Sequence, residues 1–287
     1  MNLAKSLGFI MAMLVASVVL AQDKIKAMIV DGQNNHDWKS TTPVLKEVLE
    51  KTGRFAVDIA TSPAKKAPKE EWAKFHPEFA SYGVVVLNYQ GETWPDDVKK
   101  SFEDYMSGGG GLVVYHFAVA GWPEWDNFNK MIGLGWKKNT FGDRWFMDDR
   151  GKWVRQPKGE GPGNGHGPAH VFDVAICDPD HPITKGFPAK WTHIKDELYH
   201  GQRGPAENMH ILATAFSKSD KGGTGANEPM AWTVQYGKGR VFVTLLGHDG
   251  PATADPGAAA LLARGAEWAA TEKVTIPVPA ELPAASK

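Results

Sequence analysis

Apolar residues in the first half of the chain fall into short runs separated by stretches with helical spacing. Short apolar runs at residues 25–30, 84–87 and 112–115 are typical of strands buried on both faces, and residues 55–59 alternate like a further strand. Between the runs we expect helices that begin at Pro43 and Pro95, because proline favours the first helical position. Strands that alternate with helices predict crossover connections and a mainly parallel sheet.

The middle of the chain breaks this pattern. Residues 121–169 are rich in glycine and tryptophan and show no sustained period, so we expect an irregular insertion, which at this length is more often functional than idle. Strand patterns return at residues 170–176, 209–215, 230–235 and 240–246, and a last helix is expected from Pro256. We find no repeat or internal break, which predicts one domain over residues 22–273 and a Pro/Ala-rich tail over residues 274–287.

The first 21 residues have the pattern of a secretory signal peptide. Lys5 precedes an apolar run from Leu7 to Leu20, and small residues lead to Ala21. The run is shorter than the roughly 20 residues that a membrane-spanning helix needs. We therefore expect cleavage after Ala21 and a periplasmic or secreted protein with no membrane association after cleavage.

Composition excludes several classes of function. Lys and Arg number 32 against 33 Asp and Glu, for a formal net charge of -1, which argues against a nucleic-acid partner. The single cysteine, Cys177, excludes an internal disulfide and a four-thiolate metal site. The glycine run at residues 108–111 precedes a strand and has no following GK[ST], and no GxGxxG follows a strand, so we expect no nucleotide cofactor.

Three histidines follow predicted strands. His36, His116 and His248 come after the first, fourth and last strand patterns, and ligands of parallel α/β sheets bind outside the carboxyl ends of strands. Asp196 and Glu197 add two carboxylates to the candidates. Imidazoles and carboxylates together suit a divalent metal or proton transfer near neutral pH.

The predicted roles follow from these positions. We expect catalysis by His116, Glu197 and His248, and a divalent metal, zinc or similar, on His36, His116, Glu197 and His248. Metal-free acid–base chemistry by the same residues stays open. The predicted substrate-binding residues lie around them: His36, Trp38, Asn88, Asp196, Asp249 and, from the insertion, His170. Structural roles are assigned to His166, His181, His193 and His210.

Several segments resemble the ThuA-like, or trehalose-utilisation, family. They are GGGGLVVYHFA at residues 108–118, DPDHPITKGFP at 178–188, KDELYH at 195–200 and PMAWTVQYGKGRVFVTLLGHD at 229–249, and the opening NNHDWKSTTPVLKEVLE at 34–50 matches one branch. The resemblance covers nearly all of residues 25–271. It implies the fold of class I glutamine amidotransferases, a flavodoxin-like three-layer α/β sandwich with a mainly parallel central sheet, here with the Trp/Gly-rich insertion.

The same resemblance points to sugars and away from amidotransfer. Amidotransferases carry a nucleophilic cysteine on an elbow after a strand, where this chain has His116, and Cys177 lies elsewhere in the sequence. An imidazole cannot form the thioester of glutamine hydrolysis. We expect a small-molecule substrate, a glycoside or oxidised sugar, acted on by a metal-assisted hydrolase, lyase or isomerase.

Other interpretations remain. A non-catalytic sugar-binding or interaction module, or a structural envelope protein, would use the same sheet without the chemistry, because fold alone does not determine function. Assembly into a homo-oligomer is compatible with the sequence.

Overall fold

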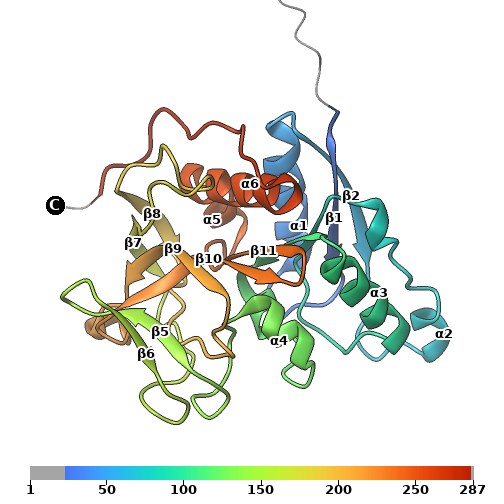
Figure 1. Cartoon of the computed structure of the whole chain (residues 1–287), viewed down its shortest axis with the longest axis horizontal. Coiled ribbons are helices and arrows are strands. Elements are labelled where there is room, and N and C mark those ends of the chain that lie inside the picture. The colour runs from blue at the N-terminus through green and yellow to red at the C-terminus, as the bar shows by residue number, and fades with distance from the viewer. Residues whose placement is uncertain (1–22, 286–287) are drawn as a thin grey trace, which may run out of the picture.

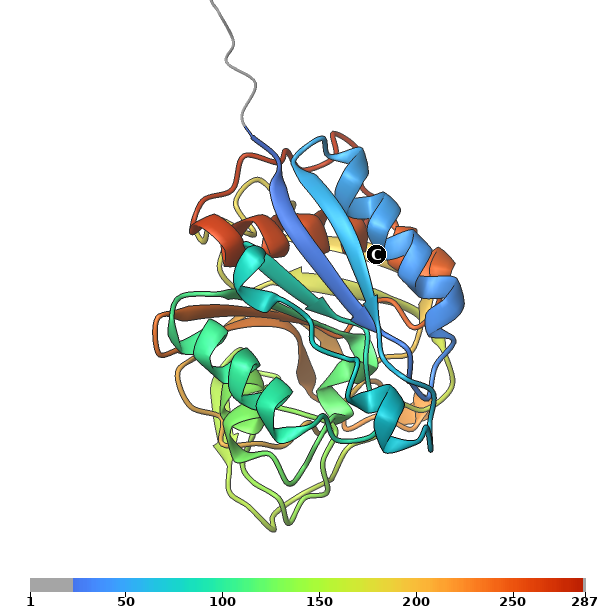
Figure 2. The same cartoon turned by 90° about the vertical axis from the view of Figure 1, so that its right-hand side faces the viewer.

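The computed structural model describes residues 23–285. The described chain forms one eleven-stranded mixed sheet with helices on both faces (Figures 1 and 2). No helix among these residues has the length and apolarity required to cross a bilayer. The strands are β1 Ile25–Asp31, β2 Phe55–Thr61, β3 Val84–Leu87, β4 Gly111–Tyr115, β5 Arg144–Met147, β6 Trp153–Gln156, β7 His170–Ile176, β8 Lys190–Asp196, β9 Met209–Phe216, β10 Asn227–Tyr236 and β11 Gly239–Thr244.

One half of the sheet is parallel, as predicted. Strands β2, β1, β3, β4 and β11 lie side by side in that order, and all four pairings are parallel. Strands β1, β3 and β4 are almost wholly buried, which explains their unbroken apolar runs. The carboxyl ends of β1, β4 and β11 therefore open onto one edge of the sheet.

The other half is antiparallel, so the prediction of a mainly parallel sheet is wrong. Strands β11, β10, β9, β7 and β8 follow in that order, each antiparallel to its neighbour. The physical reason is connection length. Only Gly237 and Lys238 separate β10 from β11, and so short a link makes a hairpin and cannot make a crossover.

Helices cover both faces of the sheet. In both views, α1, α5 and α6 lie on one face and α3 and α4 on the other (Figures 1 and 2). The first helix begins earlier than Pro43, because the Asp37 side chain accepts a hydrogen bond from the Ser40 amide and caps it. The helices are α1 Trp38–Lys51, α2 Lys69–Trp72, α3 Asp96–Ser107, α4 Asp126–Ile132, α5 Gly250–Ala254 and α6 Pro256–Thr271, with 3₁₀ turns at Phe79–Ser81, His116–Ala120 and Ser219–Lys221.

The insertion is more regular than its composition predicts. It contains α4 and the β5–β6 hairpin, and its glycine-rich end is held by the fully buried guanidinium of Arg203. That group donates to carbonyl oxygens of the insertion on both sides of the β5–β6 hairpin, including those of Gly142, Pro157 and Pro162. A charged donor among carbonyls satisfies backbone groups that regular structure leaves unpaired. The insertion therefore has one defined path.

The C-terminal tail packs on the domain. Ile276 is buried, its carbonyl accepts from Arg264, and the Thr192 amide donates to the Pro283 carbonyl at 3.0 Å. The predicted signal peptide lies outside the described residues, so export stays a prediction.

We predict that Arg203→Met loosens the insertion selectively. Methionine fills a similar volume but leaves the carbonyl oxygens without a donor, at a cost of about 1–3 kcal/mol for each buried group left unpaired. Limited proteolysis should then cut within residues 137–168 faster than in the wild type, at a temperature where both proteins are folded. Arg150→Met, at an exposed position of the same insertion, is the control and should cleave like the wild type. Equal rates for the Arg203 variant and the wild type would contradict this role.

Candidate functional site

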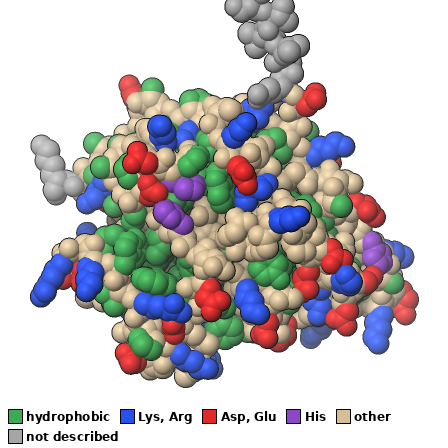
Figure 3. Space-filling view, viewed as in Figure 1, with side chains coloured by type: hydrophobic (Ala, Val, Ile, Leu, Met, Phe, Trp, Pro, Cys, Tyr) green, Lys and Arg blue, Asp and Glu red, His purple; other side chains and the backbone are tan. Residues whose placement is uncertain are grey.

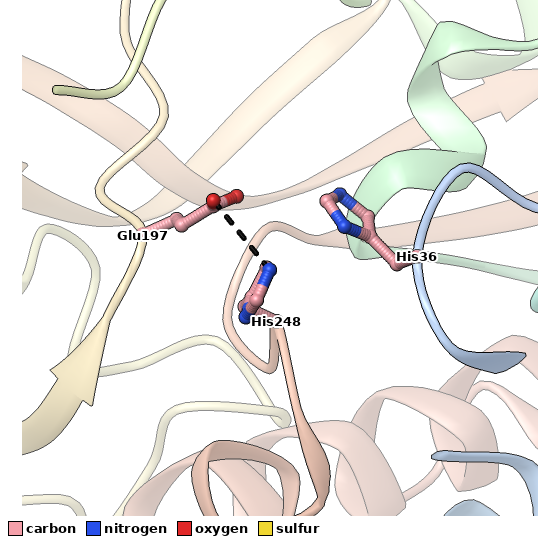
Figure 4. Close-up of side chains that lie close together, drawn as sticks. All are labelled: His36, Glu197 and His248. Atoms are coloured by element: carbon pink, nitrogen blue, oxygen red, sulfur yellow. Dashed lines mark ion pairs between the residues drawn. The ribbon is translucent and has the colours of Figure 1, made fainter. Parts of the chain in front are cut away.

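Four histidines and one glutamate meet at the carboxyl edge of the sheet. His36 comes from the loop after β1, His116 follows β4, Glu197 follows β8 and His248 lies in the loop after β11. Figure 4 shows His36, Glu197 and His248 converging from these separate segments. We call these residues, together with His166 of the insertion, the histidine centre. The predicted convergence of His36, His116, Glu197 and His248 is thus present in the structure.

Glu197 lies in the middle of the histidine centre. Its Oε1 is 3.5 Å from His248 Nε2 and 3.7 Å from His166 Nε2, and its Oε2 is 3.7 Å from His116 Nε2. The carboxylate side chain is only 14% exposed, so it has lost most of its hydration. Burial raises the pKa of Glu197, but the contact with His116 and the neighbouring imidazoles outweigh it and lower that pKa overall.

His116 is held in one orientation by the backbone. Its Nδ1 lies 2.7 Å from the Leu245 carbonyl oxygen, which can only accept, so Nδ1 carries a proton. In the neutral ring, Nε2 is then an acceptor that faces the Glu197 carboxylate. Both His116 Nε2 and Glu197 Oε2 are buried without a hydrogen-bond partner. Two buried acceptors facing each other call for a positive charge between them, either a proton or a metal ion.

The backbone at His116 is strained. Its φ is 45°, in the left-handed region that side chains rarely occupy. Such strain persists where surrounding structure fixes it, and it often accompanies function. Here it turns the chain sharply after β4 and directs the ring toward Glu197. The position matches the strand-to-helix elbow that the family resemblance implies.

His36 completes the centre and stays neutral. Its ring lies 5.0 Å from that of His116 and 4.7 Å from that of His248, measured between centroids. Burial, reinforced by the charges of these imidazoles, lowers the pKa of His36 to about 4. A neutral imidazole can bind a metal or accept a proton at neutral pH. His36 Nε2 also forms a 2.9 Å hydrogen bond with the Tyr199 hydroxyl.

Aromatic rings border one side of the histidine centre. Tyr199 packs against His116 and Trp136 with 4.5 Å between centroids in each case, and Phe117 lies 4.8 Å from His36. Burial, together with the negative charge of Glu197, raises the pKa of Tyr199, so its hydroxyl stays protonated. The aromatic wall thus combines apolar ring faces with one hydroxyl donor.

Asp196 supports the centre from beneath. Its buried carboxylate accepts hydrogen bonds from the backbone amides of Gly247 and His248 at 2.7 and 3.0 Å, and from His193 Nε2 at 2.9 Å. His193 Nδ1 lies 3.1 Å from Asp255 Oδ1. Burial opposes charge on both partners, but the contact with His193 lowers the pKa of Asp196 to about 2, and the contacts with Asp196 and Asp255 raise that of His193 to about 9. A charged triad therefore fixes the His248 loop.

The other predicted substrate-binding residues have different surroundings. Asn88 is 2% exposed and donates to the hydroxyls of Thr41 and Thr42, and Asp196 is 1% exposed. Both are poorly placed to contact a substrate, in contrast to the prediction, because their polar atoms already have buried partners. Asp249 is exposed and caps α5 by accepting from the Ala252 amide at 2.9 Å. Among the described residues, His170 packs on Phe172 and makes no ring or ion-pair contact with the centre.

Trp38 lines a groove that adjoins the centre. This strand-end groove, of about 550 Å³, lies at the carboxyl ends of β1, β2 and β3. Its walls include Asn34 and Asn35, the two residues that precede His36 in the loop after β1. Its size is within the range of small-molecule sites.

His166 belongs to the centre although the sequence interpretation assigned it a structural role. The insertion carries it there, because backbone hydrogen bonds between Gly165 and His200 join the insertion to the segment after β8. Its ring packs at 5.7 Å from Trp136. The only signal in the sequence is its position in GNGHGP, a segment whose irregular backbone was itself expected to be functional.

A metal ion would find ligands here. His36, Glu197 and His248 each offer one ligand atom, and these atoms all lie within 4.8 Å of one another. Ligands at about 2.0–2.2 Å from zinc in a tetrahedron lie roughly 3.4 Å apart, close to the 3.5 Å between His248 Nε2 and Glu197 Oε1. Outer partners orient metal ligands, and here Tyr199 contacts His36 while His116 contacts Glu197.

Comparison with known proteins identifies the family. The family model for ThuA, described as trehalose utilisation, matches residues 26–269. The chain belongs to the ThuA family. A ThuA-like protein of Parabacteroides merdae is 40% identical, with a TM-score of 0.86 over 92% of this chain and 96% of that one. A ThuA-like protein of Bacteroides uniformis is 20% identical, with a TM-score of 0.56 over 92% and 98%. None of the curated proteins matches this chain.

Membership of the ThuA family agrees with the α/β fold seen here, and the mixed sheet is compatible with a class I glutamine amidotransferase-like architecture. The ThuA chain has an imidazole at the elbow after β4, whereas Cys177 follows β7, with its Sγ beside Thr214. The Cys177 thiol therefore follows a different strand from the one that precedes the elbow at His116.

We predict that His193 links stability to pH. The pKa of His193 is raised in the folded protein. Its contribution to the free energy of unfolding is therefore complete below pH 6.5 and is lost as the pH rises through about 9. His193→Asn should remove that dependence, and the wild type should lose up to about 3 kcal/mol more unfolding free energy than the variant between these pH values. Urea unfolding at pH 6 and pH 9 measures this. His210→Asn, at the exposed ion pair with Asp178, is the control, and equal pH slopes in wild type and His193→Asn would refute the assignment.

Proposed function

We propose that the histidine centre is the active site of an enzyme that acts on a carbohydrate, a glycoside or oxidised sugar, with the help of a divalent metal. The observation that carries this proposal is the buried Glu197 carboxylate, which faces three imidazoles and has an oxygen atom without a hydrogen-bond partner. The convergence of neutral imidazole and carboxylate is the donor set that zinc and similar ions prefer.

The metal proposal rests on the chemistry of the residues present. His36, Glu197 and His248 would hold the ion, and His116 Nε2 faces the same carboxylate from the other side. A bound divalent ion would supply Lewis acidity toward a carbonyl or hydroxyl oxygen. The low pKa values of His36 and Glu197 favour the deprotonated forms that metal ligands require.

Proton transfer falls to His116, His166 and Glu197 in this proposal. His116 keeps its acceptor nitrogen directed into the centre through the Leu245 carbonyl, and a base held in this way needs no reorientation before it takes a proton. His166 enters from the insertion on the opposite side of the same carboxylate. A pair of bases around one carboxylate suits reactions that remove a proton at one atom and return it at another.

A sugar agrees with the surroundings of the centre. The half-buried rings of Phe117 and Trp136, which pack on the buried Tyr199, offer apolar surface to the C–H faces of a sugar ring. The strand-end groove is also lined by Asn35 and Gln90, whose side-chain amides can bond to hydroxyls. The family name points to the same class, and export, as predicted from the first 21 residues, would place the enzyme among extracellular saccharides.

The metal is tested by direct analysis of tag-free protein. Zinc, manganese and nickel are each offered to wild type, Glu197→Gln and His248→Ala, and bound metal is measured after gel filtration by mass spectrometry. We expect one ion per wild-type chain and a loss of affinity in both variants that exceeds the roughly 10–100-fold cost of removing an outer partner. His76→Ala, at the exposed pair with Asp97, should bind like the wild type. No bound ion in the wild type, or equal binding in all four proteins, would rule out the metal.

Catalysis is tested on a panel of disaccharides, glycosides and keto-sugars incubated with the metal-loaded protein and analysed by mass spectrometry. We expect one class to be converted by the wild type and by His76→Ala, and conversion to fall at least about 100-fold in Glu197→Gln, because general acid–base groups contribute roughly 10²–10⁴-fold. Saccharides that raise the melting temperature but are recovered unchanged would show a binding module instead of an enzyme.

A further inference from the structure

The β5–β6 hairpin forms one wall of a second pocket that shares no residue with the histidine centre. Antiparallel pairing sets Trp145 opposite Arg155 and Met147 opposite Trp153, so these four side chains occupy one face of the hairpin. That face borders a pocket of about 820 Å³ whose other wall is the start of β9 and the end of β7. We call it the hairpin pocket. Figure 3 shows hydrophobic side chains gathered over this part of the molecule, with histidine beside them.

The two tryptophans of the hairpin pocket are half-buried, and no ring stacks on either of them among the described residues. Most other tryptophans pack in aromatic clusters: Trp94, Trp122 and Trp125, for example, form one cluster in the core. Indole faces that border a pocket and remain free of ring partners offer a flat apolar platform to a ligand. Because Trp145 and Trp153 stand on the same face of a hairpin, they form a platform and not a box around a cation.

The charges of the hairpin pocket exclude ionic ligands. Asp178 and Glu207 lie on its rim, and Arg155 is already bound to Asp143 at 2.7 Å. Phosphate or carboxylate groups would meet two acidic residues without a free cation, and an organic cation would meet Arg155 across from Trp145. The polar groups instead suit hydroxyls, since Glu207 and Asn208 accept hydrogen bonds and Asn208 also donates them, while Asp178 is paired with His210 at 2.8 Å.

The segment that carries the opposite wall is held in an unfavourable conformation. Ala206 and Asn208 have φ values of 53° and 52°, in the left-handed region, and both line the hairpin pocket. Alanine rarely adopts this conformation because its Cβ crowds the backbone. The turn is fixed from behind, where the Ala206 amide donates to the Gly133 carbonyl at 3.0 Å. The pocket wall is therefore preformed, which favours binding without a rearrangement.

We propose that the hairpin pocket is a second carbohydrate site, which binds a neutral saccharide by stacking its rings on Trp145 and Trp153. Acidic and amide groups on the rim would accept the saccharide hydroxyls. The site does not depend on the chemistry of the histidine centre. The site would hold a longer glycan or a polysaccharide on the protein whether or not the histidine centre is catalytic.

The test uses isothermal titration calorimetry with cellohexaose, xylohexaose and maltohexaose. The background is the full chain carrying Glu197→Gln and His248→Ala, so that turnover and metal binding at the histidine centre cannot contribute. We expect one of these hexasaccharides to bind, and Trp145→Ala and Trp153→Ala each to weaken binding at least roughly tenfold. Trp72→Ala, a half-buried tryptophan outside the hairpin pocket, is the matched control and should leave binding unchanged. Circular dichroism confirms that each variant is folded, and Trp153→Phe should retain part of the affinity.

Two results would overturn the second site. One is the absence of heat with all three hexasaccharides at about 10 mM, a concentration at which even weak sites are occupied. The other is binding that persists unchanged in both Trp145→Ala and Trp153→Ala. Because the background replaces Glu197 and His248, saccharide binding that depends on Trp145 and Trp153 supports the second site even if the metal and turnover experiments fail, and failure here leaves those experiments unaffected.

Discussion

The geometry of the histidine centre depends on the hydrogen bonds that the buried carboxylate of Asp196 accepts. This carboxylate accepts hydrogen bonds from the Glu197, Gly247 and His248 amides and from His193, and so joins the end of β8 to the loop after β11. In the strand order, β11 and β8 lie at opposite ends of the antiparallel half of the sheet and do not pair with each other. The hydrogen bonds of Asp196 therefore hold Glu197 near His248, which strand pairing alone does not do. A carboxylate this deeply buried needs a positive partner, which His193 provides.

The parallel half of the fold could be predicted because its strands carry their own signal. The apolar runs of β1, β3 and β4 and the proline before α3 are local features, and the rule that ligands bind at carboxyl strand ends then selected His36 and His116. The antiparallel half could not be predicted from apolar runs in the same way. Strand β8 has the sequence KWTHIKD, in which one of the buried positions is His193, so its alternation looks polar although Trp191 and His193 both face inward. A buried charged histidine hides a strand from any pattern based on hydrophobicity.

His166 and Asp196 show the same limit within the site. The role of His166 depends on Arg203, which is distant in sequence and fixes an insertion that has little regular structure of its own. Asp196 and Glu197 are neighbours in the sequence. Because side chains alternate in direction along a strand, the end of β8 turns Asp196 inward and Glu197 toward the imidazoles. The sequence identified both carboxylates, but only the fold separates the supporting carboxylate from the one at the centre.

The two carboxylates differ in the groups that balance their charge. Asp196 accepts from three backbone amides and from the protonated His193, so its charge is balanced inside the protein. Glu197 is less buried, with 14% of its side chain exposed, and around it stand His36, which is neutral, and His116, whose acceptor nitrogen faces Glu197 Oε2 at 3.7 Å. Protonating His116 would balance one charge, while a divalent ion would balance it and also occupy the acceptor nitrogens of His36 and His248. The protein thus fixes Asp196 with buried donors and leaves one oxygen of Glu197 among imidazoles without a hydrogen-bond partner, which is the arrangement expected of a support and the site that it serves.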